Sequence, residues 1–598
     1  MEFAVKTLVP DEVYTDRQEF LDYFYDYALK AATRRAMSTV LLGKRRMGKT
    51  EIFKRVVNRL FFEQDHTDPQ AVVPVYFSFP EKALTGTDFA LKYIENFIRW
   101  YAAFRLREPE LLKPLVYEQR DALVLYVTES LPTRMSKGFA SALHMLKSIE
   151  EGGVTLPEER ALLLPRTLSD WDDNTIVMFL DEFQNTRMPH EDGFDIVGFM
   201  QDAVESPTCP HFVTGSAMTI LSKEILGRGA LFGRFESEPI EPLTEYWGTE
   251  LVRRASRYYQ ARVPTLLFPV LSNRCGGNPF YITAVVKQTA RQGTLLDSEE
   301  AINKMLAVDL SSGFIWAELN DQVTRWIARM NQYGITKWVL YLSALEEGER
   351  IEPQHIQQQL REKEGIQVSL ETIRDVLIRL SRGDLLEYME LGGWFRKADD
   401  PILLDFLKVW GKIDVEGRER IRVMEETINQ YTALRRRIND QKGYLAEVYL
   451  AQMLWNGQGR RFPGRCFHTD HEVVFPSPFY SVRQRMRLDA ASESEVDVYA
   501  FAAGEIWICE SKWWETRNVG VKEVREFLAL AEKVKNFEGR EYFERARPLT
   551  LRLWLFAHNG VSPQAKALLR EHNIYWSTRV DLDALIRETG LRRLPKSE

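Results

Sequence analysis

Residues 43–50, GKRRMGKT, form a glycine-framed stretch that ends in Lys49 and Thr50. They match G-x-x-x-x-G-K-[ST], in which backbone N–H groups surround phosphate oxygens at the start of a helix. We predict that Lys49 contacts the β- and γ-phosphates of ATP and that the Thr50 hydroxyl binds Mg²⁺. A basic turn that matches by chance is the alternative, but apolar strand and helix patterns flank the motif. The other predicted contacts in this loop are Gly43, Lys44, Arg45, Arg46, Met47 and Gly48.

A pair of acids follows the apolar stretch IVMFLDEF at residues 176–183. We predict that Asp181 holds Mg²⁺ through its water shell and that Glu182 orients or deprotonates the attacking water. A metal between the terminal phosphates and a positioned water are what hydrolysis of a phosphoanhydride requires. The alternative is an acidic pair that caps a core strand, and the phosphate motif upstream weakens it.

Two further signals concern the same chemistry. Ser216, at the end of HFVTGS, is a candidate contact to the γ-phosphate or to the water. In the stretch LGRGALFGRFESE, Arg228 and Arg234 are candidates for an arginine that stabilises transition-state charge, which is worth about 10³–10⁵ in rate. Surface arginines are common, and of the two we favour Arg234.

A second reactive group is suggested by EVDVYAFAAGEIWICESKWW, residues 495–514. If two strands pair around Gly504, Asp497 lies near Glu510 and Lys512, and the last two share one face because they are two residues apart. Carboxylates there would hold Mg²⁺ or Mn²⁺, and the lysine would steady an activated water. Glu447, on a predicted amphipathic helix upstream, is a third candidate metal ligand. The alternative is an exposed edge strand with a salt bridge.

The elements that must position these residues are read from hydrophobic periodicity. Short apolar strands at 37–43, 71–79, 174–185 and 211–219 alternate with helical patterns, which favours a mostly parallel α/β sheet. Three short helices and a hairpin around Gly392 and Gly393 are typical of a winged helix. We predict a nucleotide-binding core, a helical lid, a winged helix, a helical connector and a second α/β domain, at 1–250, 251–333, 334–400, 401–430 and 431–598.

Composition limits the class of protein. The 598 residues are 45% hydrophobic and 28% charged, as in globular proteins with several domains. We expect no membrane segment and no signal peptide. The scattered cysteines, without a CxxC pair, predict a reducing, cytoplasmic location. The net charge is −7, but the part after residue 430 is mildly basic, which is compatible with a nucleic-acid partner.

Residues from about 8 to 410 resemble the archaeal-type ATPase family, among the P-loop ATPases related to the AAA+ and STAND groups. The shared motifs are YTDRQEFL, GKRRMGKT, FLDEFQ, VTGS, LFGRF and GGNPFYI. In relatives the Gly-Asn-Pro turn lies over the base, so the resemblance implies a contact from Pro279. It also implies a homo-oligomer in which Arg234 reaches a neighbour's nucleotide. We find no second sensor arginine near Gly276 and Gly277.

Residues from about 430 to 598 resemble the PD-(D/E)xK nuclease fold of restriction-endonuclease-like enzymes. The resemblance implies metal and catalytic roles for Glu447, Asp497, Glu510 and Lys512. Val496 stands where the named motif has proline, while the charged positions are all present. We therefore expect an active site.

Together these patterns predict an ATP-hydrolysing switch coupled to a metal-dependent DNA nuclease, with defence against foreign DNA as a setting. One alternative is a nucleotide-gated DNA-binding regulator whose nuclease-like domain does not cleave. Another is a signalling ATPase without a nucleic-acid substrate. For the winged helix, packing on the ATPase is favoured over DNA binding, because the helix that would enter a groove carries acids as well as arginines.

Overall fold

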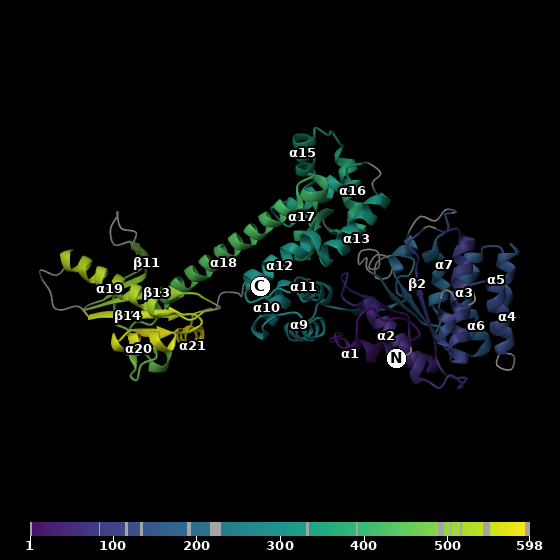
Figure 1. The fold of residues 1–598 in the computed structure, drawn as a ribbon, viewed down its shortest axis with the longest axis horizontal. Helices are drawn as coiled ribbons and strands as arrows, with labels where there is room; N and C mark the ends of the chain where they lie inside the picture. Colours follow the sequence, from purple (N-terminus) through teal and green to yellow (C-terminus); the bar gives the residue numbers. More distant parts are fainter. Residues whose placement is uncertain are drawn as a thin grey trace. The chain divides into compact units, whose positions relative to one another are not determined.

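The protein is described here by a computed structural model, which divides into two compact units, Met1–Ile428 and Asn429–Glu598 (Figure 1). Each unit is considered by itself. The described residues are 3–82, 84–113, 116, 118–131, 136–187, 193–215, 229–330, 334–389, 393–487, 495–502, 504–514, 517–541 and 550–591.

A five-stranded sheet forms the centre of the first unit, in the order β2-β3-β4-β1-β5. Every neighbouring pair of strands is parallel, which confirms the predicted parallel α/β sheet. Its central strands are fully buried, as expected for apolar strands covered on both faces. The strand bounds are β1 Thr39–Leu42, β2 Val73–Ser78, β3 Ile176–Asp181, β4 His211–Thr214 and β5 Glu236–Pro239.

Helices pack around this sheet and form one hydrophobic core with it. Helix α2 starts directly after the glycine-rich loop and buries Ile52, Phe53, Val56 and Val57, which recur at helical spacing. Helices α3, α5 and α6 lie side by side in Figure 1 and contact one another. The bounds are α1 Gln18–Lys30, α2 Lys49–Glu63, α3 Gly86–Leu106, α4 Arg120–Ser130, α5 Lys137–Glu150, α6 Pro157–Asp172 and α7 Ile196–Val204.

The rest of the first unit is mainly helical. After β5 come α9 Glu245–Tyr259, α10 Phe268–Arg274, α11 Pro279–Gln292, α12 Glu299–Ser312 and α13 Phe314–Met330. The expected three helices and hairpin follow, joined by a short strand β6 in the order β6-β8-β7. Their bounds are α14 Thr336–Leu345, β6 Arg350–Ile351, α15 Pro353–Glu364, α16 Leu370–Arg382, β7 Leu386–Met389 and β8 Trp394–Lys397. Helix α17, Pro401–Trp410, packs against α12, α13 and α14.

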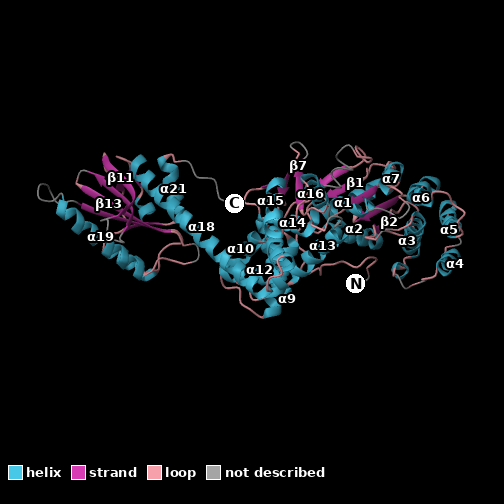
Figure 2. Ribbon diagram, turned by 90° about the horizontal axis from the view of Figure 1, so that it is seen from above, coloured by secondary structure: helices cyan, strands magenta, loops and turns pink. Residues whose placement is uncertain are grey.

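Helix α18, Arg420–Asn456, begins in the first unit and ends in the second. The second unit has a five-stranded sheet in the order β11-β12-β13-β14-β15. Strands β11, β12 and β13 pair antiparallel, and β13, β14 and β15 pair parallel. Figure 2 draws the strands as magenta arrows. The bounds are β11 Phe479–Arg487, β12 Glu495–Ala502, β13 Glu505–Lys512, β14 Thr550–Ala557 and β15 Tyr575–Ser577.

Helices α19 Val521–Glu541, α20 Pro563–Glu571 and α21 Arg579–Thr589 complete this unit, with a small sheet of β9 Arg461–Phe462 and β10 Val473–Val474. Two apolar clusters form, one with α18 and α21 and one with α19 and α20. The predicted pairing of β12 with β13 around Gly504 is confirmed. Gly504 has a φ of 84°, a conformation that favours glycine.

Two properties of the described residues bear on the expectations from composition. None of the described helices combines the length and the apolar character that crossing a membrane would take. All four cysteines are buried and free, in agreement with the expectation that they form no disulfide framework: Cys209, Cys275, Cys466 and Cys509.

Candidate functional site

The glycine-rich loop lies between β1 and α2, as the motif predicts. Gly43 directly follows β1 and lies close to Ile240, which directly follows β5: an added Cβ would lie 2.2 Å from Ile240 Cγ2. Gly48, at a φ of 90°, caps the N-terminus of α2. These two glycines therefore permit a turn that other residues could adopt only with strain or displacement.

Lys49 is the most buried cation of this loop, with 6% of its surface exposed. Its Nζ donates to the carbonyl oxygens of Gly43 at 2.6 Å and of Lys44 at 2.7 Å. Burial lowers the pKa of Lys49 to about 8, and the negative charge of Asp384 opposes this shift. The ammonium is thus held at the centre of the loop, where phosphate oxygens would neutralise the cost of its burial.

A cavity of about 490 Å³ opens beside the loop. This volume lies within the range of small-molecule and cofactor sites. Its lining brings together predicted residues that lie far apart in the chain, namely Arg45, Arg46, Met47, Gly48, Lys49, Thr50, Asp181, Glu182 and Pro279. Apolar side chains from the N-terminal segment and the helical part line it as well, with Leu8, Val9, Val13, Tyr14, Leu251 and Phe280. The cavity therefore offers charged groups that suit phosphates and apolar side chains that suit an aromatic base.

Asp181 ends β3 and is buried, with 2% of its surface exposed. One carboxylate oxygen accepts from the backbone N–H of Glu182 and the other from the Tyr76 hydroxyl, both at 2.8 Å. These donors fix the carboxylate while leaving lone pairs for the water shell of a cation. Thr50 is in the first turn of α2 and lines the same cavity. The oxygen donors of Thr50 and Asp181 fit Mg²⁺.

Glu182 follows with a φ of 54°, an uncommon conformation for a residue other than glycine. Its carboxylate accepts a hydrogen bond from the Gln184 side chain. Burial raises the pKa of Glu182, and the neighbouring charge of Asp181 raises it further. A carboxylate with a raised pKa is a better proton acceptor than a solvated one, as a base that activates water needs to be.

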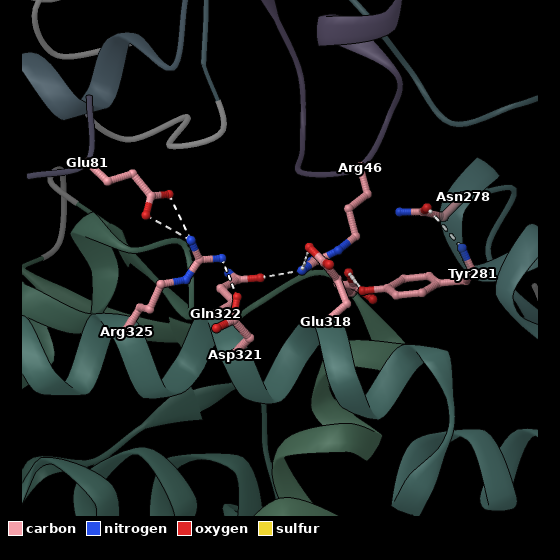
Figure 3. A network of polar contacts seen from close by, with 9 residues as sticks. Arg46, Glu81, Asn278, Tyr281, Glu318, Asp321, Gln322 and Arg325 are labelled. Atoms are coloured by element: carbon pink, nitrogen blue, oxygen red, sulfur yellow. Dashed lines mark hydrogen bonds and ion pairs between the residues drawn. The ribbon is translucent and has the colours of Figure 1, made fainter. Parts of the chain in front are cut away.

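Helix α13 reaches the loop through a polar network that the sequence did not reveal (Figure 3). Arg46 donates to Gln322 at 2.7 Å and to Glu318 at 3.3 Å, and its guanidinium lies 5.1 Å from the Phe280 ring centre. One turn further along, Arg325 pairs with Glu81 at 2.8 Å, in the loop after β2. The helix therefore contacts both the phosphate loop and the edge of the cavity.

The segment 334–400, which contains α14–α16 and β6–β8, also contacts the loop. Lys44 Nζ lies 2.6 Å from a carboxylate oxygen of Asp399, just after β8. The Tyr281 hydroxyl donates to Asp400 at 2.7 Å. The Asp384 carboxylate, at the turn after α16, acts electrostatically on both Arg45 and Lys49. These contacts agree with the prediction that the segment 334–400 packs on the part of the chain that carries the glycine-rich loop.

The remaining predicted residues of this site have different outcomes. Ser216 and Arg228 lie outside the described residues. Arg234 is described, and its Nε lies 2.8 Å from a carboxylate oxygen of Glu205 in the same chain. Pro279 is the first residue of α11, whose N-terminus is capped by the Asn278 side chain. Residues that sequence reasoning missed are the α13 set and, in the N-terminal segment, Leu8, Val9 and Val13, for which the sequence carries no local chemical motif.

The second group of predicted residues lies where β12 begins and the antiparallel β13 ends. Asp497 accepts from the backbone N–H of Ser511 at 2.7 Å. Lys512 Nζ lies 2.7 Å from Glu510 Oε1, so these two side chains share a face as the spacing predicts. Burial raises the pKa of Asp497 to about 7, and the charge of Glu510 adds to the shift. Burial alone would lower the pKa of Lys512, but attraction to Glu510 raises it.

Glu447 approaches this group from α18 and is buried, with 7% of its surface exposed. Arg485 of β11 binds it with two hydrogen bonds, at 2.8 and 3.2 Å. The charge of Glu447 adds to the raised pKa of Asp497, after burial and the charge of Glu510. Within the described ranges, no group of three or more His, Cys, Asp or Glu side chains is arranged to hold a metal ion. Asp497 and Glu510 lie on the paired strands β12 and β13, whereas Glu447 is engaged by Arg485.

Comparisons with known proteins give likenesses of fold only. No family model and no curated protein matches the chain. The Walker-type ATPase of Pyrococcus abyssi is 16% identical with a TM-score of 0.42, and the match covers 68% of this chain and 99% of that one. The Aeropyrum pernix ORC1 protein, solved in complex with DNA, is 12% identical with a TM-score of 0.37, covering 69% and 97%.

The RuvB Holliday junction branch migration motor of Thermotoga maritima is 12% identical with a TM-score of 0.30, covering 64% of this chain and 92% of that one. At TM-scores below 0.5, none of these likenesses determines the fold or the function. We therefore interpret the cavity beside the glycine-rich loop from the sheet order, the loop geometry and the lining residues alone.

Proposed function

We propose that the first unit binds ATP with Mg²⁺ and hydrolyses it. The observation that carries the proposal is that Lys49, Asp181 and Glu182 line one cavity, although the acids are more than a hundred residues from the lysine. A phosphate-binding loop, a buried metal-binding carboxylate and a second carboxylate of raised pKa are the parts that hydrolysis of a phosphoanhydride needs. The apolar side chains that line the cavity are suited to the adenine base.

In this reaction the water oxygen bonds to the γ-phosphorus while the bond from that phosphorus to the β–γ bridging oxygen breaks. Glu182 accepts the proton of the water, and the products are ADP and phosphate. Lys49 and the N-terminus of α2 hold the phosphate oxygens. Mg²⁺, held by Thr50 and Asp181, would neutralise the developing charge on the leaving group.

The test is Glu182→Gln in the full-length chain. We expect this variant to bind ATP with an affinity near that of the wild type, because the loop and Asp181 remain, and to hydrolyse it about 10²–10⁴-fold more slowly. Glu419→Gln, which changes an exposed carboxylate of the same unit, is the matched control and should turn over normally. Equal turnover in Glu182→Gln and the wild type would remove Glu182 from the reaction.

We further propose that the second unit is a Mg²⁺- or Mn²⁺-dependent DNA nuclease whose access to DNA depends on the nucleotide bound by the first. The observation that favours it is the meeting of Asp497, Glu510 and Lys512 at one end of β12 and β13. A cation there would be held by Asp497, Glu510 and water. Lys512 would steady the attacking water, whose oxygen bonds to phosphorus as one P–O ester bond breaks and the leaving oxygen takes a proton.

Edge strand β11 supports a DNA substrate. Arg483, Arg485 and Arg487 alternate along it and are exposed. Arg485 binds Glu447, and Arg483 and Arg487 suit contacts to a phosphate backbone. Defence against foreign DNA, and assembly of several copies through the first unit, are the setting we propose. The alternatives are a DNA-binding regulator whose second unit does not cleave, and a signalling ATPase without a nucleic-acid substrate.

A plasmid-nicking assay discriminates among these. We expect the wild type to nick supercoiled DNA with Mg²⁺ or Mn²⁺ and Lys512→Ala to be inactive. Lys522→Ala, which removes an exposed lysine at the start of α19, is the control and should cleave normally. DNA binding without metal-dependent nicking by the wild type would overturn the nuclease proposal and favour the regulator. Neither binding nor nicking would favour the signalling ATPase.

A further inference from the structure

Two neighbouring arginines of the phosphate loop have different surroundings. The guanidinium of Arg46 is engaged by Gln322 and Glu318 of α13 and by the Phe280 ring. Arg45 has no hydrogen bond or ion pair among the residues that the structure describes, and its Nε and Nη2 atoms are buried. Its close contact is the Trp326 ring, 5.9 Å from the guanidinium carbon.

Buried guanidinium nitrogens without partners are costly, because they have lost water and gained no acceptor. Arg45 lines the main cavity together with Lys49 and Glu182. It also lines a small adjoining cavity of about 40 Å³, again with Glu182. Arg45 therefore borders both cavities that Glu182, the base we propose for water activation, also lines.

The other arginines of this cavity are already occupied. Arg325 pairs with Glu81 at 2.8 Å and with Asp321 at 2.5 Å. Arg17 donates to the carbonyl oxygen of Glu241 at 2.5 Å. Among the described arginines that line the cavity, Arg45 is thus the one whose guanidinium has no protein acceptor to give up when an anion binds.

We propose that Arg45 binds the γ-phosphate of ATP in cis and so distinguishes ATP from ADP. This inference rests on the ATPase function proposed above and names the residue that recognises the third phosphate. Two N–H donors of a guanidinium match the oxygens of a phosphate in a fork-like geometry. Arg45 keeps its protons throughout: it offsets the charge on the γ-phosphate oxygens while the water proton goes to Glu182.

This role differs from the one predicted for Arg234, which would act on a neighbouring copy. A contact made within the chain needs no assembly, so ATP selectivity should be the same in dilute and concentrated protein. Because ADP lacks the γ-phosphate, a residue that contacts only this group should affect ATP binding and leave ADP binding unchanged.

The experiment measures Kd for ADP and for a non-hydrolysable ATP analogue, both with Mg²⁺, in the full-length chain. We expect Arg45→Gln to weaken binding of the analogue by about 10- to 100-fold, the range for hydrogen bonds to charged groups, and to leave ADP binding within a few-fold of the wild type. Arg45→Lys keeps the charge but not the fork and should lose less. Arg46→Gln, the matched control, should shift both affinities by the same factor.

Equal weakening of ADP and analogue binding by Arg45→Gln, or no weakening of either, would overturn the inference and leave Arg45 a packing residue for Trp326. If Arg45→Gln does not fold, Arg45→Lys decides by the same ratio: a selective loss supports the inference and an unselective one overturns it. A wild-type chain that binds neither nucleotide would instead overturn the proposed ATPase function. The two failures are therefore distinguishable.

Discussion

Asp309 offers a quantitative test of how the helix that contacts the phosphate loop is anchored. It lies near the end of α12, is fully buried, and accepts a hydrogen bond from the backbone N–H of Ile315 at 3.1 Å, in the first turn of α13. Its Oδ2 atom is buried and has no hydrogen-bond partner among the residues that the structure describes. Helix α13 carries Glu318 and Gln322, so Asp309 helps to fix the helix that binds Arg46.

The magnitude follows from the pKa of this carboxyl group. Burial raises the pKa of Asp309 from 3.8 to about 7, while hydrogen bonds from Ile315 and Phe314 oppose the shift. Between these two values the folded chain keeps a proton that the unfolded chain releases. The free energy of unfolding must then fall as pH rises from about 4 to 7, by about 4 kcal/mol at most, and stay low above that range.

Asp309→Asn removes this titration and keeps an oxygen that can accept from Ile315. We expect the variant and the wild type to have similar stability near pH 5. Near pH 8 the variant should be more stable by up to about 3 kcal/mol, which is the part of the wild type's loss that falls above pH 5. Urea unfolding of both full-length proteins across pH 5–8 measures the difference, and other titrating groups cancel in it. A difference that does not change with pH would refute the buried, protonated state of Asp309.

The remaining predictions concern the two proposed sites. Lys49→Ala should weaken ATP binding by about 10- to 100-fold, measured calorimetrically, because it removes the charged donor held between the Gly43 and Lys44 carbonyls; unchanged affinity would contradict this role. If Arg234 acts on a neighbouring copy, wild-type turnover per chain should rise with protein concentration, and constant specific activity in a proven monomer would exclude the role. Asp497→Asn should abolish DNA cleavage and leave ATP hydrolysis within a few-fold of the wild type. Cleavage by the wild type should also differ between ADP and ATP, and identical cleavage in both would show two independent activities.

The sequence predicted much of the first unit because its signals are local. The glycines of residues 43–50, the apolar strand before them and the helix after them lie within about twenty residues of one another, and their geometry is set by backbone preferences. Apolar runs with polar ends also located β3 and β4, from which the parallel sheet followed. The pairing of β12 with β13 was predictable for the same reason, since a short turn joins them.

Strand β11 was not predicted. Its stretch FYSVRQRMR carries arginines at alternate positions, and an edge strand exposed to solvent lacks the apolar run that marks a buried one. Only the pairing with β12 makes it a strand, and only that pairing brings Arg485 to Glu447. Glu447, which we predicted to be a metal ligand, therefore also forms an ion pair with Arg485. No spacing in the sequence indicated this pair.

The sequence by itself determined the residue types and the short-range geometry of both sites: the loop that ends in Lys49, the acids after β3, and Glu510 and Lys512 on one strand face. The tertiary structure decided which distant residues join them. It brought Arg46 to α13 and Lys44 to Asp399, and it left Arg45 without an acceptor among the described residues, at a cavity that Glu182 also lines. The physical reason is that periodicity and turn chemistry act over a few residues, whereas these contacts depend on sheet order and helix packing across more than a hundred.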